Sequence, residues 1–227
     1  MVSTEKKIKQ KPKGIPEPTI RRMPKYHDYV KRKKSEGEVY LSAPRIAHRL
    51  RLDPTQVTKD LAYTGITGRP RIGYNVDDLL KAIENFLGFN HLDHAFLIGA
   101  GSLGTALVGY PGFEEYGVKI VAAFDNNPAK VGSKIRGVPV LHIDKFRDLA
   151  ERMHVAFGII TTPAEQAQQI ADLMISWGIK AIWNFSPINI IVPEHIIIQN
   201  TSIYANLAVI MNKLHYKMEN EEVKNQI

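Results

Sequence analysis

The segment Gly99–Gly104, with the sequence GAGSLG, has a glycine spacing that points to a specific chemistry. It follows the apolar run AFLI and precedes TALV, which is typical of a helix. In a strand–turn–helix unit the first glycine permits a tight turn, the second lets backbone approach a pyrophosphate, and the third allows close helix–strand packing. The helix amides and dipole then hold the phosphates. We therefore expect a dinucleotide to be bound by Gly99, Ala100, Gly101, Ser102, Leu103 and Gly104.

A carboxylate completes this candidate site. Asp125 ends the predicted strand KIVAAFD, 21 residues after Gly104. At such a position a carboxylate binds the adenosine ribose hydroxyls and repels a 2′-phosphate, which favours NAD(H) over NADP(H) as the cofactor. The alternative is an empty Rossmann-like turn in which Asp125 merely caps a loop.

Thr161, Thr162 and Pro163 end another predicted strand. They lie on the edge where sheets of this kind bind ligands, so we include them in the cofactor site. The simpler interpretation is helix capping, with Thr162 as the N-cap and Pro163 at the first helical position. The two roles are compatible.

The chain offers no candidate for catalysis. The eight histidines are scattered, and His91 and His94 bracket Asp93 with no third metal ligand in view. There are no cysteines, which excludes disulfides, thiolate nucleophiles and thiolate metal sites. Hydride-transferring enzymes of this fold normally add a substrate domain with a general acid or base. We therefore expect no catalytic residue and no metal, and a nucleotide that is sensed and not consumed.

The charge is distributed unevenly along the 227 residues. Residues 1–88 carry 19 Lys and Arg against 10 Asp and Glu, whereas residues 89–227 carry 11 against 13. A basic front on a nearly neutral rear predicts two modules, of which the first meets a polyanion.

The front module has the signals of a series of short helices. A helix is predicted from Thr19 to Ser35, before the helix-ending Gly37. Ser42 and Asp53 are typical N-caps, so a second and a third helix are expected to follow them.

Turn residues then separate these helices from a fourth. Gly65–Val76 contains four Gly and Pro residues, with Ile72 and Tyr74 at strand spacing, which predicts a short hairpin. Asp77 is predicted to cap a helix that ends at Gly88. Short helices followed by a hairpin within about 60 residues are typical of a winged helix-turn-helix.

The segment Pro54–Tyr63 is the predicted recognition helix. If Val57 and Leu61 face the core, Thr55, Gln56, Thr58 and Lys59 face outward. Gln can read adenine, Lys can read guanine or pair with phosphates, and arginines at the hairpin tip can reach a groove or the backbone. The candidate DNA-binding residues are Arg22, Gln56, Thr58, Lys59, Arg69 and Arg71. A winged helix that binds a protein partner is the alternative.

The rear module alternates apolar runs with helical patterns. The runs cover residues 95–98, 118–124, 155–160 and 179–183, and a helix is predicted over Ala164–Trp177. This βαβ order predicts a Rossmann-like parallel sheet in an α/β chain. A last apolar helix, Ile203–Met218, extends beyond the sheet. The predicted divisions are a basic disordered tail over 1–14, a winged-helix domain over 15–88, a dinucleotide-binding domain over 89–202 and a C-terminal dimerisation helix over 203–227.

Several strings together match one known family. They are IPEPTIRRMPKY, VTKDLAYTGITGRPRIGYNV, LIGAGSLGTAL, YPGF, AAFDNNPAKVG, TTPAEQAQ and NFSP. Over about residues 15–216 the sequence resembles the Rex family of NAD(H)-responsive transcriptional repressors. The resemblance implies a homodimer in which the C-terminal helix packs on the partner subunit. It also implies operator DNA as the partner, repression of fermentative or respiratory genes, and release from DNA when NADH replaces NAD.

The chain departs from the family pattern at its DNA-binding segments. The family usually has Arg-Lys-Asp-Leu where this chain has Thr58-Lys59-Asp60-Leu61, and Lys/Arg-Arg-Gly where it has Arg69-Pro70-Arg71. Ser102 replaces a common Asn in the glycine-rich turn. We expect an altered operator preference.

A second departure concerns the switch between states. The resemblance implies a charge pair between an Arg late in the first helix and an Asp before the C-terminal helix. This chain has Asp28 and Ser202 at those two positions and keeps Tyr110 as the hydrogen-bonding partner near the cofactor. Losing both charges removes an ion pair without leaving one charge unpaired. We therefore expect a divergent member whose DNA binding responds less to NADH, or responds through other contacts.

Other functional classes remain open from the sequence. A Rossmann-fold enzyme or a CoA-binding subunit would leave the basic front unexplained, and an assembly protein would bind no DNA. No apolar stretch approaches the length of a membrane span, so we expect a cytoplasmic protein without membrane association.

Overall fold

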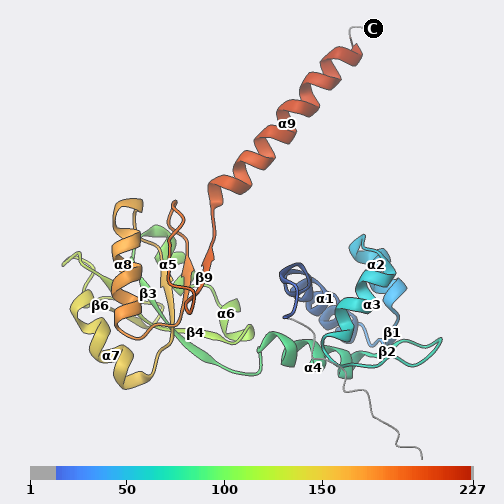
Figure 1. The fold of residues 1–227 in the computed structure, drawn as a ribbon, viewed down its shortest axis with the longest axis horizontal. Helices are drawn as coiled ribbons and strands as arrows, with labels where there is room; N and C mark the ends of the chain where they lie inside the picture. The colour runs from blue at the N-terminus through green and yellow to red at the C-terminus, as the bar shows by residue number, and fades with distance from the viewer. Residues whose placement is uncertain (1–13, 226–227) are drawn as a thin grey trace, which may run out of the picture. The chain divides into compact units, whose positions relative to one another are not determined.

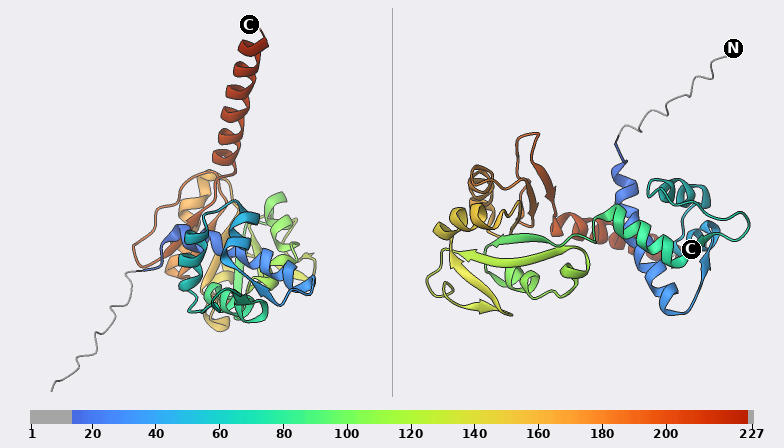
Figure 2. Two further views of the ribbon diagram at one scale, coloured as in Figure 1. Left: turned by 90° about the vertical axis from the view of Figure 1, so that its right-hand side faces the viewer. Right: turned by 90° about the horizontal axis from the view of Figure 1, so that it is seen from below.

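The computed structural model describes residues 14–225, with side chains through Met218. The chain divides into two compact units between Asn90 and His91. Figures 1 and 2 show the elements of each unit from three directions. The predicted tail over residues 1–14 lies outside the described residues except for Gly14.

The first unit packs four helices around a two-stranded sheet. Its elements are α1 (Glu17–Ser35), β1 (Tyr40–Leu41), α2 (Ala43–Leu50), α3 (Pro54–Ala62), β2 (Tyr74–Asn75) and α4 (Val76–Leu87). Each helix contributes fully buried apolar side chains to one core, among them Tyr26, Ile46, Leu61 and Ile83. The predicted helix-turn-helix is therefore present in α2 and α3.

In the first unit, helix starts follow the predicted caps in two of three cases. The Ser42 hydroxyl accepts from the Arg45 amide at 3.4 Å, and the Asp53 carboxylate accepts from the Gln56 amide at 3.0 Å. The prediction of Asp77 as a cap is wrong. Asn75, in extended conformation at the end of β2, accepts from the amide three residues on at 3.1 Å, so α4 begins at Val76.

The predicted hairpin over Gly65–Val76 is wrong in its strands. Ile72 lies in the turn, which is closed by a single bridge between Arg69 and Gly73. β2 pairs instead with β1, antiparallel, about thirty residues earlier in the chain. Gly73 (φ +105°) makes this pairing possible, because a Cβ there would lie 2.4 Å from the carbonyl oxygen of Leu41.

The second unit is built on a seven-stranded sheet. Its order is β5-β6-β4-β3-β7-β8-β9, and every pair is parallel except β5 with β6. The strands are β3 (Asp93–Ile98), β4 (Val118–Asp125), β5 (Lys134–Ile135), β6 (Val138–His142), β7 (Phe157–Ile160), β8 (Ala181–Asn184) and β9 (Ile197–Asn200). The chain leaves β3 toward β4 and later returns to its other side as β7. Sheets of this topology bind ligands at the carboxyl ends of the strands beside such a reversal.

Helices cover both faces of this sheet (Figure 1). The covering helices are α5 (Ser102–Val108), α6 (Gly112–Glu115), α7 (Phe146–Met153), which follows the 3-10 turn Ile143–Lys145, and α8 (Ala164–Ser176). Successive β3 side chains alternate between the faces: Phe96 packs with α7 and α8, whereas Leu97 belongs to the cluster that includes residues of α5 and α6. The alternation gives each face its own apolar core, and the parallel pairing of β3 with β4 and β7 confirms the predicted parallel sheet.

The last helix, α9 (Ile203–Asn225), begins directly after β9. Every side chain described on it, from Ile203 to Met218, is exposed. The exposed apolar side chains on it include Tyr204, Leu207, Ile210 and Leu214. A helix with this composition requires a covering surface, since solvent exposure of so many apolar groups is costly.

Candidate functional site

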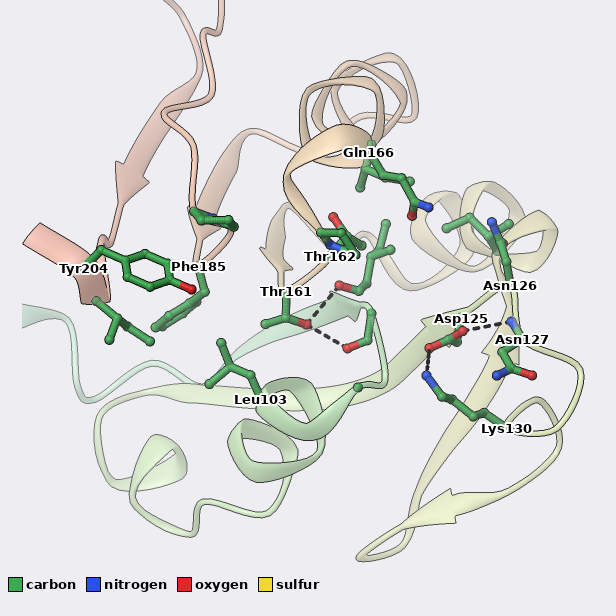
Figure 3. A pocket seen from close by; sticks show the side chains of 18 residues that line it. Leu103, Asp125, Asn126, Asn127, Lys130, Thr161, Thr162, Gln166, Phe185 and Tyr204 are labelled. Atoms are coloured by element: carbon green, nitrogen blue, oxygen red, sulfur yellow. Dashed lines mark hydrogen bonds and ion pairs between the residues drawn. The ribbon is translucent and has the colours of Figure 1, made fainter.

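A pocket of about 830 Å³ lies at the carboxyl ends of β3, β4 and β7 (Figure 3). It forms where the topology predicts ligand binding, because the three strands end beside the reversal of the sheet order. Seven of the predicted cofactor residues line it: Gly99, Gly101, Leu103, Asp125, Thr161, Thr162 and Pro163.

The three glycines have three different surroundings. Gly99 (φ +104°) makes the turn after β3, and a Cβ there would lie 2.9 Å from the carbonyl carbon of Thr161. At Gly104 a Cβ would lie 2.0 Å from the Gly99 carbonyl oxygen, so this glycine permits close packing of α5 on the turn. A Cβ at Gly101 would meet nothing within 4 Å. Gly101 therefore leaves open space in the pocket wall, which fits a ligand that approaches the backbone.

The Asp125 carboxylate is held by three donors. One oxygen accepts from the Ala100 amide and from the Lys130 ammonium, both at 2.9 Å, and the other accepts from the Asn127 amide at 2.8 Å. Burial alone would raise the pKa of Asp125, but the hydrogen bonds from Asn127 and Lys130 lower it. The aspartate thus ties the glycine-rich turn to the end of β4, and an ammonium beside it offsets its charge (Figure 3).

Thr161 and Thr162 differ in their roles. The Thr161 hydroxyl donates to the Gly99 carbonyl at 2.7 Å and so braces the glycine-rich turn. The prediction of Thr162 as a helix cap is wrong: α8 begins at Ala164, its N-cap position is Pro163, and no side chain caps it. The buried Thr162 hydroxyl has no hydrogen-bond partner among the described residues. A ligand in the pocket can satisfy this group.

Several residues that line the pocket were not predicted, and one predicted cofactor residue lies at a different pocket. Missed lining residues include Asn126, Asn127, Lys130, Gln166, Phe185 and Tyr204. Of these, Lys130 had a signal, since it follows Asp125 by five residues in the string AAFDNNPAKVG. Tyr110, predicted at the cofactor, instead lines a separate pocket with Phe113, whose ring it meets edge-on.

In the first unit α3, the predicted recognition helix, is anchored through Asp60. Its carboxylate is fully buried and accepts from Arg22 Nε at 2.6 Å, Tyr26 at 2.6 Å and Thr19 at 2.9 Å. Gln56 adds a fourth donor, Nε2, at 2.9 Å. Burial alone would raise the pKa of Asp60, but these hydrogen bonds lower it to about 2.

Two of the side chains predicted to contact DNA, Arg22 and Gln56, take part in this anchor. Arg22 pairs with Asp60 through two nitrogens and is only 23% exposed, so it joins α1 to α3. Gln56 turns its amide toward the same carboxylate because an i,i+4 partner is available on its own helix. Nothing in the sequence indicated that Asp60 faces inward, since charged residues are seldom fully buried.

The remaining predicted contacts are exposed. Thr58 and Lys59 lie on the outer face of α3, and the Thr58 hydroxyl donates to the Pro54 carbonyl. Arg69 donates to the Tyr40 hydroxyl at 2.9 Å and stacks over its ring, which orients the guanidinium at the base of the turn. Arg71 is exposed at the turn with a left-handed φ of +62°.

Other site types have no support in the described residues. No group of three or more His, Asp or Glu within residues 14–218 is arranged to hold a metal ion. None of the helices in the described part of the chain is long and apolar enough to cross a bilayer.

Comparison with known proteins assigns both units. Residues 14–62 match the family model "Putative DNA-binding protein N-terminus", and residues 90–188 match "CoA binding domain". The redox-sensing transcriptional repressor Rex of Bacteroides fragilis is 48% identical over 202 residues, which cover 89% of this chain and 92% of the relative. This chain belongs to the Rex family. The Rex of Treponema denticola is 46% identical and covers 86% of this chain and 94% of its own.

Solved Rex-family structures agree in fold. RSP in complex with β-NAD+ and operator DNA has a TM-score of 0.87 at 31% identity, covering 94% of this chain and 98% of its own. RSP in complex with β-NADH has a TM-score of 0.82. The Rex relatives are repressors and not enzymes, which agrees with the absence of a predicted catalytic residue.

The departures from the Rex pattern have separate surroundings. The Asp28 side chain is 64% exposed on α1, with its carboxylate 3.4 Å from His27 Nδ1. The Ser202 hydroxyl accepts from the Ala205 amide at 3.0 Å and so caps α9, which an aspartate would also do. Relative to the pattern that the resemblance implies, Ser202 therefore removes a charge but keeps the cap of α9.

Proposed function

We propose that this chain is a cytoplasmic redox-sensing repressor that binds operator DNA as a homodimer and is released by NADH. The first unit supplies the DNA-binding surface and the second the NAD(H) pocket. The observation that carries the proposal is the combination of an anchored recognition helix with a glycine-lined pocket in one Rex-family chain. Exposed α9, with its apolar side chains, supplies the contact with the partner subunit.

The pocket residues fit a dinucleotide. The open backbone at Gly101 and the uncapped first turn of α5 would receive the pyrophosphate, with Asp125 toward the adenosine ribose. The unsatisfied Thr162 hydroxyl offers a further hydrogen bond. When bound, the dinucleotide supplies a nicotinamide ring whose charge and planarity differ between NAD and NADH. Contacts that distinguish the two forms are what couple redox state to DNA binding.

Lys59 is the side chain on α3 that we expect to pair with DNA. Lys59→Ala should weaken operator binding by roughly tenfold and lower the slope of log affinity against log salt by about one, because one phosphate contact is lost. NADH affinity should not change. Lys81→Ala, which removes an exposed lysine from α4, is the matched control. Equal effects of the two variants on operator affinity would mean that net charge and not α3 governs binding.

Lys130 sets how strongly the pocket discriminates between dinucleotides. Its ammonium partly neutralises Asp125, so the carboxylate repels a 2′-phosphate less than it would alone. Lys130→Met should therefore raise the preference for NADH over NADPH by about fivefold, as measured from the two dissociation constants. Lys119→Met, which breaks an exposed pair with Glu114, should leave the preference unchanged. A preference that falls in Lys130→Met would contradict this role.

In vitro selection tests the function as a whole. Random DNA duplexes are selected with the purified full-length chain, and the selected duplex is titrated with NADH, NAD and coenzyme A in parallel. We expect an inverted repeat, which mirrors the two-fold symmetry of a dimer, and release by NADH alone. Release by coenzyme A and not by NADH would favour the CoA-binding alternative. Failure to select any sequence would favour a winged helix that binds protein.

A further inference from the structure

A buried polar network lies at the carboxyl edge of β7, β8 and β9. Ile160, Asn184 and Asn200 are register partners on these three strands. Asn184 is fully buried, and its Nδ2 donates to the Ile188 carbonyl at 2.7 Å and to Asn200 Oδ1 at 2.8 Å. Its Oδ1 accepts from the Ser186 amide at 2.8 Å. Asn184 thus has partners on both the loop after β8 and the end of β9.

Ser186 connects this network to the pocket wall. It is 4% exposed, and its hydroxyl donates to the main-chain carbonyl of Thr162 at 2.6 Å. Thr162 lines the pocket, as do Phe185 and Pro187 on either side of Ser186. In Figure 3, Phe185 and Thr162 both border the cavity. A ligand that engages Thr162 therefore acts on a residue whose carbonyl is bonded to Ser186.

The other end of the network reaches the first residues of α9. The Thr201 amide donates to the Asn184 carbonyl at 2.8 Å, one residue before Ser202 caps α9. Asn200 Oδ1 also accepts from the Ile190 amide at 3.0 Å. This side chain at the end of β9, just before α9, is therefore hydrogen-bonded to the loop after β8.

The loop between these ends has space on both sides. A second cavity of about 330 Å³ is lined by residues 186–189 together with residues from the base of α9. Pro187 lines both this cavity and the large pocket. A segment with cavities on two sides is less tightly packed than a close-packed core, and so has room for two arrangements.

We propose that Ser186 and Asn184 are positioning residues that couple occupancy of the pocket to the orientation of α9. The proposal deepens the proposed function and rests on it. A buried polar network keeps its members paired, so a shift of the Thr162 carbonyl obliges Ser186 and Asn184 to move with it. That movement reaches the base of α9 through the Thr201 amide and the Asn200 side chain.

The test measures coupling separately from binding. For full-length protein, the operator dissociation constant is measured without NADH and at saturating NADH, and the ratio of the two is the coupling factor. The variant is Ser186→Ala. The matched control is Ser176→Ala, which removes an exposed serine hydroxyl bonded to the Leu173 carbonyl at 2.7 Å. In Ser186→Ala we expect the operator affinity without NADH and the NADH affinity without DNA to stay within about twofold of wild type. The operator affinity at saturating NADH should rise, so that the coupling factor is at least about fivefold smaller. Ser176→Ala should match wild type.

Several results would overturn the proposal. One is an unchanged coupling factor in Ser186→Ala. Another is a Ser186→Ala protein that loses NADH affinity but keeps the full coupling factor at saturating NADH, because Ser186 would then only shape the pocket wall. A wild-type protein that shows no NADH effect on DNA overturns the proposed function itself.

Hydrogen exchange of the wild-type protein gives an answer even if the variant fails to fold. On addition of NADH we expect amide exchange rates to change both in residues 184–190 and in residues 200–205. An unchanged rate in residues 200–205 would show that the pocket does not reach α9 by this path.

Discussion

Replacing Arg22 by Met should lower the free energy of unfolding of the first unit by roughly 3 kcal/mol. The substitution leaves the fully buried Asp60 carboxylate without its cationic partner, and breaking a buried pair on one side costs more than the pair contributes as a whole. This expected loss lies at the low end of the usual range for breaking a buried ion pair, because the Arg22 side chain is 23% exposed. Both tryptophans lie in the second unit, so urea unfolding followed by tryptophan fluorescence and by circular dichroism separates the two units.

Arg21→Met is the matched control for this prediction. Arg21 precedes Arg22 on the same helix, and its pair with Glu17 is 60% and 69% exposed. Such a surface pair contributes at most about 0.5 kcal/mol. If the two substitutions destabilise the protein equally, the Asp60 anchor does not hold α3 in place.

The Arg22 effect should depend on pH in a definite direction. The pKa of Asp60 is about 2 in the folded chain against an ordinary value of 3.8. A lowered carboxylate pKa contributes stability that is fully present above 3.8 and is lost as the pH falls toward 2. The difference in the free energy of unfolding between wild type and Arg22→Met should therefore narrow by about 2 kcal/mol as the pH falls from 3.8 toward 2. A difference that widens on acidification would contradict the charge assignment.

Gly101→Val should abolish dinucleotide binding and leave the fold intact. A Cβ at Gly101 meets no atom within 4 Å, and the backbone there (φ −81°, ψ −169°) suits any residue. The added side chain would occupy the space in which a pyrophosphate approaches the backbone. We expect NADH affinity to fall by roughly 100-fold, equivalent to about 3 kcal/mol, with a stability loss of about 1 kcal/mol from the poorer helix cap. Calorimetric NADH titration and thermal unfolding measure the two effects.

Gly104→Ala is the contrasting variant in the same turn. Its Cβ would lie 2.0 Å from the Gly99 carbonyl oxygen, so backbone must shift, and we expect a stability loss of about 3 kcal/mol. For Gly101→Val, which cannot bind the ligand, we expect the same operator dissociation constant with and without NADH. If Gly101→Val retains NADH binding, the ligand does not lie over this turn.

The sequence predicted the pocket well because its determinants are local. The turn at Gly99–Gly104 and the carboxylate at Asp125 each follow a continuous apolar strand, and parallel pairing brings their ends together. Lys130 and Phe185 were not predicted to line the pocket, because the positions of their side chains depend on the conformations of loops. Thr162 does not cap α8 because Pro163 takes the N-cap position with an extended ψ of 158°, so that the helix begins at Ala164.

In the DNA-binding unit, periodicity located the helices but not the polar contacts between them. Val57 and Leu61 face the core as predicted, yet helical spacing alone did not show that Asp60 is buried beside them. A buried carboxylate needs donors from elsewhere, and Thr19, Arg22 and Tyr26 lie about forty residues away in sequence. Long-range pairing of this kind also explains the error over the partner of β2.

The redox state of the dinucleotide is expected to control operator binding. The most direct measurement is the fraction of selected operator duplex bound by the full-length chain as the NADH to NAD ratio is varied, at constant total dinucleotide and constant salt. We predict that the bound fraction falls as the ratio rises, and that Gly101→Val abolishes the dependence. A bound fraction that is the same at every ratio in the wild-type protein would contradict the account.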